Sequence, residues 1–114
     1  MPHFILDCSS DVITQVPIEV ILKEVYYTAA RTNLFKLGDI KVRIQPFDHY
    51  DVGNERKNFI HVFAHVMEGR TTEQKADLSH RVVSKLKELF PSVPVISMNV
   101  VEFEKATYNN LNSI

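Results

Sequence analysis

The chain has 114 residues, which is enough for one compact domain and too few for two full hydrophobic cores. Its 13 Lys and Arg residues against 14 Asp and Glu residues give a net charge of −1. No basic excess exists to attract a nucleic-acid backbone or an acidic membrane, so we expect neither as a partner. A domain of this size buries a modest fraction of its surface, and association with further copies is a natural way to complete its core.

The single cysteine and the first residues favour a cytoplasmic location. Cys8 has no second cysteine for an internal disulfide, which suits a reducing compartment. The opening residues carry no basic leader, and their apolar run stops at Asp7, so we expect neither a signal peptide nor an anchor. No segment approaches the roughly 20 apolar residues that cross a bilayer.

The first half of the chain predicts a strand, a helix and a second strand. Residues 4–6 form a short apolar run that ends in the turn-rich cluster 7–11. A helical period begins at Pro17, which suits a first helical turn. Its apolar side carries Ile18, Ile21, Leu22, Val25 and Ala29. Residues 40–45 then alternate strictly between apolar and polar, which is typical of a half-buried strand.

The second half repeats this order after a hairpin-like turn at residues 51–54. A long strand is predicted over residues 59–67, again from alternation. Thr71 can cap the following helix, with Gln74 as its capping-box partner. The helix side that we expect to be buried carries Ala76, Ser79, Val83, Leu86 and Phe90. A last strand is predicted over residues 95–103.

The order β-α-β followed by β-α-β predicts an α/β (α+β) fold in one domain, residues 1–114. Two such units give a four-stranded mixed sheet, with both helices packed on one face. The other face would be bare and would carry Phe63 and Met67. An apolar face of this kind calls for partner subunits.

Pro2 is the most informative position for chemistry. Removal of Met1, usual when the second residue is small, would expose a secondary amine at Pro2. An amino-terminal amine has an ordinary pKa of about 7.7–8.0, and burial or neighbouring cations lower it. A neutral amine near pH 7 is what a general base for carbon acids requires. Proline is also common at position 2 without any function, so its surroundings decide the interpretation.

Three cations near strand ends could bind an acidic substrate. Arg70 follows Gly69 and directly precedes the second helix, whose amino terminus also favours a carboxylate. Lys41 and Arg43 share the polar side of the second strand, about 6.6 Å apart along it, and could hold a carboxylate or polarise an enolate oxygen. Local sequence equally allows that Arg70 is a solvated loop arginine. For Lys41 and Arg43, local sequence alone favours the solvated side of an edge strand.

The histidines do not predict a metal site. His61 and His65 would be neighbours on a helix, but the alternation places them on a strand, where four residues span about 13 Å. Two ligands of one zinc ion, each at about 2.0–2.1 Å, cannot be that far apart. We find no Ser/His/Asp signature, no Gly-rich phosphate loop and no CxxC, and we interpret Cys8 as a small buried residue.

Several short segments resemble a known family. They are Met1-Pro2-His3-Phe4-Ile5 with Asp7-Cys8-Ser9, Leu34-Phe35-x-Leu37-x-x-Ile40-x-x-Arg43, Phe59-Ile60-His61-Val62 and Gly69-Arg70-Thr71-x-Glu73. In order and spacing, they resemble 5-carboxymethyl-2-hydroxymuconate isomerase, a member of the tautomerase superfamily with 4-oxalocrotonate tautomerase and macrophage migration inhibitory factor. The likeness runs over nearly the whole chain, with a shorter loop around residues 51–57.

The resemblance implies a doubled β-α-β fold, a homotrimer with sheets packed around a three-fold axis, and no cofactor. It also implies an amino-terminal proline that moves a proton between two carbons of an unsaturated keto acid. Carboxylate binding carries over onto Arg70 and onto Lys41, where the family pattern has Arg. A lysine keeps the charge but loses the planar bidentate grip on a carboxylate, for which the neighbouring Arg43 can compensate.

Three functions are therefore open from the sequence. The first is an isomerase of the 5-carboxymethyl-2-hydroxymuconate type, acting on a small dicarboxylic or keto-acid substrate with Pro2 as base. The second is a tautomerase of another enol acid, such as phenylpyruvate. The third is a non-catalytic trimeric binding module of the same fold, which predicts a retained Met1 or an ordinary amine pKa at Pro2.

Overall fold

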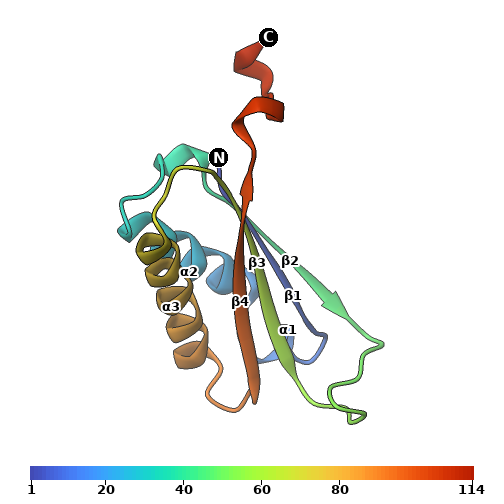
Figure 1. Cartoon of the computed structure of the whole chain (residues 1–114). Coiled ribbons are helices and arrows are strands. Elements are labelled where there is room, and N and C mark those ends of the chain that lie inside the picture. Colours follow the sequence, from blue (N-terminus) through green and yellow to red (C-terminus); the bar gives the residue numbers. More distant parts are fainter.

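A computed structural model describes all 114 residues as a mixed sheet with two long helices on one of its faces (Figure 1). The elements are β1 (His3–Ser9), α1 (Val12–Gln15), α2 (Ile18–Arg31), β2 (Lys41–Phe47), β3 (Phe59–Met67), α3 (Thr72–Leu89) and β4 (Val95–Phe103). Short 3₁₀ turns occupy Leu37–Asp39, Lys105–Thr107 and Leu111–Ser113.

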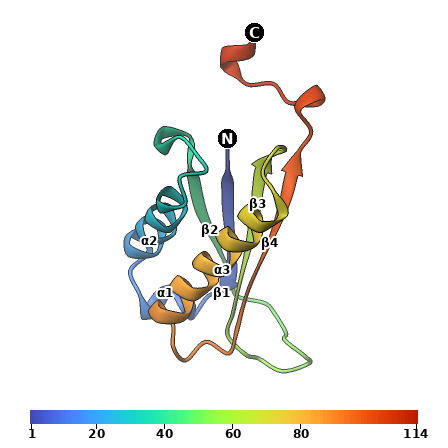
Figure 2. The same ribbon diagram turned by 60° about the vertical axis from the view of Figure 1, so that its left-hand side comes forward.

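The strands lie in the order β2-β1-β3-β4. β1 runs parallel to β2 through α2, β3 runs parallel to β4 through α3, and the two units meet where β1 and β3 pair antiparallel. The predicted four-stranded mixed sheet, with its helices on one face, is confirmed (Figure 2). The hairpin-like turn at residues 51–54 is confirmed, because Val52 and Glu55 form an antiparallel bridge with reciprocal backbone hydrogen bonds of 2.7 and 3.1 Å. The strands β2 and β3 on either side of this loop do not pair with each other, since they lie on opposite sides of β1. The turn itself is present, with positive φ at Gly53 and Asn54.

Element bounds differ from the prediction mainly in the first half. The first strand reaches Ser9, so residues 7–9, expected as a turn, continue the ladder. The short helix α1 was not expected. β2 continues past residue 45 to Phe47 and includes Pro46, which an edge strand tolerates because its outer side needs no ladder hydrogen bond. The strands 59–67 and 95–103 are confirmed as predicted.

The core lies between the sheet and the two helices. Its largest fully buried side chains include Phe4, Leu6, Ile21, Ile60 and Phe90. The predicted phase of α3 is partly wrong, since the buried row is Leu78, Val82 and Leu86, whereas Ala76 is exposed and Ser79 and Val83 are half-buried. The structure buries the row with the larger apolar side chains because burial free energy scales with the apolar area removed from water.

The opposite face of the sheet has no covering layer in the monomer (Figures 1 and 2). Side chains of β1, β2, β3 and β4 form cross-strand rows there, such as Arg43, Ile5, Phe63 and Asn99. Beyond β4 the chain leaves the body of the sheet (Figure 1). None of the helices combines the length and apolar character of a bilayer-spanning segment.

Candidate active site

The amino terminus lies at one end of the sheet, directly before β1 (Figures 1 and 2). Pro2 is buried beneath Met1. The backbone N–H of Lys41 donates a hydrogen bond of 3.1 Å to the Pro2 carbonyl oxygen, which extends the β1–β2 ladder by one residue. Pro2 is therefore fixed by the sheet and is not part of a loose tail.

The environment of the amino terminus disfavours positive charge. With Met1 in place, burial is the largest cause that lowers the pKa of the terminal amine below its ordinary value. The Asp39 carboxylate opposes this shift, whereas the positive charges of Arg70 and Lys41 add to it. The structure thus brings two of the predicted cations together with Pro2. They approach from two sides, since Lys41 pairs with His3 on the open face and Arg70 contacts Phe35 on the helical side.

Arg70 is held by the turn between β3 and α3. Gly69 has φ of +120°, a conformation that side chains rarely adopt, and it reverses the chain after β3. Thr71 then caps α3 through the predicted capping box with Gln74, which is confirmed. The Arg70 guanidinium donates to the carbonyl oxygens of Met67 (3.1 Å) and Leu34 (2.6 Å). No carboxylate forms an ion pair with Arg70, so its charge stays available to an anionic substrate.

Lys41 and Arg43 share one side of β2 but have different partners. Lys41 Nζ donates to the carbonyl oxygen of Asp39 at 2.9 Å, next to the amino terminus. Arg43 donates to His3 Nδ1 at 3.1 Å and does not contribute to the pKa shift of the terminal amine. The two predicted cations therefore differ in their surroundings, because Arg43 is hydrogen-bonded to the His3 ring whereas Lys41 is one of the charges that lower the pKa of the terminal amine.

Sequence reasoning missed three residues at this end of the sheet. Asp39 belongs to a 3₁₀ turn, and its negative charge raises the pKa of the terminal amine. The ring of Phe35 lies 4.9 Å from the Arg70 guanidinium carbon. His3 accepts a hydrogen bond from Arg43. Phe35 and His3 belonged to segments that carried the family resemblance. No local signal tied Phe35 to Arg70, Asp39 to the amino terminus or His3 to Arg43, since the members of each pair are at least 35 positions apart in the chain.

The open face of the sheet holds a shallow hollow of about 360 Å³ beside His3, Arg43, His65 and Phe103. Phe103 packs on both histidines, with ring centroids 5.9 Å apart in each pair. On the same face, both ring nitrogens of His61 are engaged, by Ser97 at 2.7 Å and Asn99 at 2.6 Å. No group of three or more potential ligands could hold a metal ion. Cys8 is fully buried, as predicted, and burial raises its thiol pKa to about 11.

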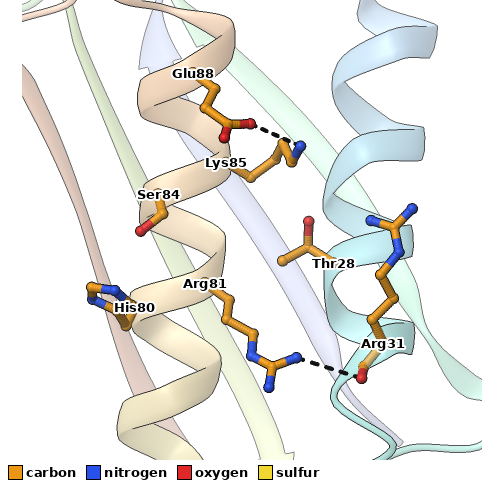
Figure 3. Close-up of a pocket in the computed structure, with 7 residues that line it drawn as sticks. All are labelled: Thr28, Arg31, His80, Arg81, Ser84, Lys85 and Glu88. Carbon is orange, nitrogen blue, oxygen red and sulfur yellow. Dashed lines mark hydrogen bonds and ion pairs between the residues drawn. The ribbon is translucent and has the colours of Figure 1, made fainter.

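A second hollow, of about 330 Å³, lies between α2 and α3 (Figure 3). Two of its cations, Lys85 and Arg81, already have carboxylate partners. Lys85 pairs with Glu88 at 2.9 Å, and Arg81 pairs with Asp77 at 2.9 Å and donates to the Arg31 carbonyl oxygen at 3.5 Å. The Arg81 hydrogen bond to Arg31 and an ion pair between Lys85 and Glu24 at 3.8 Å link the two helices across the groove. The amino-terminal end of the sheet, where buried Pro2 lies beside an amine whose pKa is lowered by burial and two cations, is the better candidate.

A doubled β-α-β sheet, with its first residues buried between two cations, defines a tautomerase-like fold. The sequence model of the family 5-carboxymethyl-2-hydroxymuconate isomerase matches residues 2–114, and the chain belongs to this family. The protein is accordingly an isomerase.

Comparisons with individual proteins agree with this assignment. The chain is 23% identical over 106 residues to the 5-carboxymethyl-2-hydroxymuconate Delta-isomerase of Escherichia coli, covering 91% of this chain and 84% of the relative. The 5-carboxymethyl-2-hydroxymuconate isomerase structure from Deinococcus radiodurans R1 superposes with a TM-score of 0.82 at 21% identity, over 96% of this chain and 87% of that one. A fused 4-OT, solved as a symmetric trimer, superposes with a TM-score of 0.78 at 13% identity, over 98% of this chain and 95% of that one.

Proposed function

We propose that the protein is a cofactor-independent isomerase that moves a proton on an unsaturated keto or enol carboxylic acid of the 5-carboxymethyl-2-hydroxymuconate type. Pro2 serves as the general base after Met1 has been removed. The observation that carries the proposal is the environment of the amino terminus, where burial and the charges of Arg70 and Lys41 lower the amine pKa. Removing Met1 transfers the free amine to Pro2, which is itself buried and hydrogen-bonded to β2.

The reaction needs only a base and a place for negative charge. The neutral Pro2 amine takes a proton from the substrate's hydroxyl group or allylic carbon, and the released electron pair spreads over the conjugated system as a dienolate. The protonated amine then returns the proton at another carbon. The product has the same atoms and oxidation level as the substrate. A base with a pKa near the working pH is the most efficient for such a transfer.

The two cations have separate roles in this scheme. Arg70 has no carboxylate partner and anchors one carboxylate of the substrate with the N–H groups that its backbone acceptors leave free. Lys41, on the other side of the amine, holds a second carboxylate or stabilises the dienolate oxygen. Electrostatic groups of this kind contribute about 10²- to 10³-fold each in a water-poor site. Arg43 supports the site indirectly through His3.

The proposal includes a homotrimer in which the open faces of the sheets surround a three-fold axis. The open face carries apolar side chains such as Ile5 and Phe63 without a covering layer. Leu111 and Ile114, in the segment beyond β4, are 84% and 92% exposed. A relative of the same fold is a symmetric trimer. Light scattering should give three times the chain mass of 13.1 kDa. With its one reduced, buried thiol, the enzyme would act in the cytoplasm.

The decisive experiment combines intact mass with kinetics. The purified protein should lack Met1, and it should convert 5-carboxymethyl-2-hydroxymuconate with a change in ultraviolet absorbance. Pro2→Ala, which also permits Met1 removal, should lower kcat/KM by about 100-fold or more, the usual contribution of a general base. Pro17→Ala, at the start of α2, is the matched control and should leave the rate unchanged. Retained Met1, or a parental rate in Pro2→Ala, would refute the proposal.

The lysine at position 41 favours one alternative substrate within the same class. An acid with a single carboxylate, such as phenylpyruvate in its enol form, needs only Arg70 as its anchor, and a point charge at Lys41 suffices for the enolate oxygen. A panel of enol acids decides between the two. If Lys41→Arg greatly improves turnover of the dicarboxylate while phenylpyruvate is already a good substrate, the monocarboxylate is the natural type.

A further inference from the structure

The guanidinium of Arg70 is held on three sides. Its two terminal nitrogens donate to Met67 O at 3.1 Å and Leu34 O at 2.6 Å, and its central carbon lies 4.9 Å from the ring centroid of Phe35. Both acceptors are neutral carbonyl groups, and the aromatic ring attracts a cation without neutralising it. The side chain is therefore fixed in direction while its full positive charge is kept.

Phe35 in turn is packed against the strand that begins at Pro2. Its ring meets Phe4 edge to face, with centroids 6.1 Å apart and planes at 81°. Phe4 is fully buried in β1, two residues after Pro2. A continuous set of contacts thus runs from β1 through the Phe4 and Phe35 rings to Arg70. The position of the cation relative to the amine depends on this packing.

The segment that carries Phe35 is itself ordered by local hydrogen bonds. Thr32 ends α2 with its hydroxyl donating to Ala29 O at 2.6 Å, and the Leu34 N–H donates to the same hydroxyl at 3.3 Å. Asn33, with φ of +60°, turns the chain in a conformation that asparagine tolerates better than most residues. This turn places the Leu34 carbonyl and the Phe35 ring against the same guanidinium.

We propose that Phe35 is a positioning residue of the amino-terminal site, acting through Arg70 to keep its guanidinium directed toward the amine and the bound carboxylate. The inference rests on the proposed function, because it assigns Arg70 the role of substrate anchor. Phe35 itself is not expected to touch the reacting atoms. Its loss should leave the base intact and release Arg70 to rotate into solvent.

Phe35→Leu tests this, because it keeps an apolar side chain and removes the aromatic face. We expect kcat/KM to fall about 10-fold, mainly through a higher KM, as a loosened carboxylate anchor would give. The pKa of the Pro2 amine, followed by NMR of protein labelled with ¹⁵N-proline, should rise because the nearby positive charge has moved away. Phe35→Tyr, which retains the aromatic face, should restore both values. If Phe35→Leu fails to fold, Phe35→Met provides the same test with a flexible apolar side chain.

A matched control is available elsewhere in the chain. Tyr50 stacks on Arg56 with 4.4 Å between the guanidinium carbon and the ring centroid, in the loop before β3. Tyr50→Leu removes an equivalent contact and should change neither KM nor the amine pKa. A double-mutant cycle adds a second test, because Phe35→Leu combined with Arg70→Lys should cost no more than Arg70→Lys alone if the ring acts through Arg70.

Folded Phe35→Leu with parental KM and an unchanged amine pKa would overturn the inference, even if its melting temperature were lower. Full additivity in the double-mutant cycle would overturn it as well. Failure of the proposed function would look different. In that case Pro2→Ala would turn over substrate at the parental rate, while the amine titration would still report whether Phe35 positions Arg70.

Discussion

The backbone N–H of Lys41 donates a 3.1 Å hydrogen bond to the carbonyl oxygen of Pro2. This contact joins the first residues of β1 to the start of β2, across 39 positions of sequence, and it sets the Lys41 side chain beside the amino terminus. On the other side of the amine, Arg70 arrives from the turn after β3. The electrostatic character of the site therefore depends on three separate segments meeting at one end of the sheet.

Lys41→Met should lower kcat/KM for a dicarboxylic substrate about 10- to 100-fold, because a charge-assisted hydrogen bond contributes about 1.5–3 kcal/mol. The side-chain length and the backbone bond to Pro2 are retained, so the effect isolates the charge. The amine pKa should rise at the same time, since Lys41 is one of the groups that lower it.

Lys57→Met is the control for this change. Lys57 is exposed, pairs with Glu55 at 2.7 Å and lies in the loop between β2 and β3. Steady-state kinetics of both variants, with the amine titration, provide the measurement. Equal rates for Lys41→Met and Lys57→Met would show that Lys41 does not act on the substrate.

Gly69→Ala should lower the free energy of unfolding by about 1–3 kcal/mol, the usual cost of a side chain in a sparsely populated backbone conformation. The reason is the φ of +120° at Gly69, because an added Cβ would make only an ordinary contact, 3.8 Å from Lys105 Nζ. Any backbone relaxation displaces Arg70, so KM should rise too. Gly38→Ala is the matched control, since its added Cβ would meet nothing within 4 Å and its φ is not positive. Urea unfolding of the two variants checks the difference, and equal stabilities would contradict it.

Stability should decrease on acidification in a way that depends on His3. Burial, followed by the charges of Arg43, Lys41 and His65, lowers the pKa of His3 below its ordinary value of about 6.5. The unfolded chain then binds the His3 proton more readily than the folded chain. The free energy of unfolding consequently falls as the pH drops below about 6.5. The contribution of His3 to this fall ends below the pKa that His3 has in the folded protein.

The measurement is urea unfolding between pH 7.5 and pH 5. His3→Gln should flatten the acid side of the stability curve, whereas His49→Gln, in an exposed loop position, should leave its slope as it is. The Arg43 hydrogen bond to His3 Nδ1 requires that nitrogen to be unprotonated, which agrees with the direction of the shift. If the free energy of unfolding fell with acidification in His3→Gln as steeply as in the parent, His3 would be excluded as the cause.

Leu78→Ala should destabilise the protein by about 2–5 kcal/mol, as expected for a leucine removed from a packed core. Leu78 is fully buried in α3, whereas Ala76, two residues earlier, is exposed. Ala76→Ser should therefore stay within about 0.5 kcal/mol of the parent. Chemical unfolding of the two variants tests which face of α3 meets the core, and a larger effect at Ala76 would reverse the assignment.

Local patterns in the sequence were enough to identify the four strands, the two long helices and their order, although not the short helix α1. Alternation identified the strand at residues 59–67 to the residue, the bounds predicted for the last strand, 95–103, also hold, and the Thr71–Gln74 capping box identified the start of α3. These signals are local, because strand and helix periods, caps and turn residues depend on neighbours only a few positions away. The doubled β-α-β order then left few topologies, and the mixed sheet with helices on one face followed.

Only the tertiary structure decided the partners of the charged side chains and the buried row of α3. Arg43 donates to His3 while Lys41 donates to the Asp39 carbonyl oxygen, although both lie on the same side of β2. Arg70 is held by Leu34 and Phe35, which are at least 35 positions away in the chain. Contacts of this kind depend on strand register and on which elements pack together, and a local period carries no information about either. The partners and the orientation of each cationic side chain at the site therefore depend on the folded sheet.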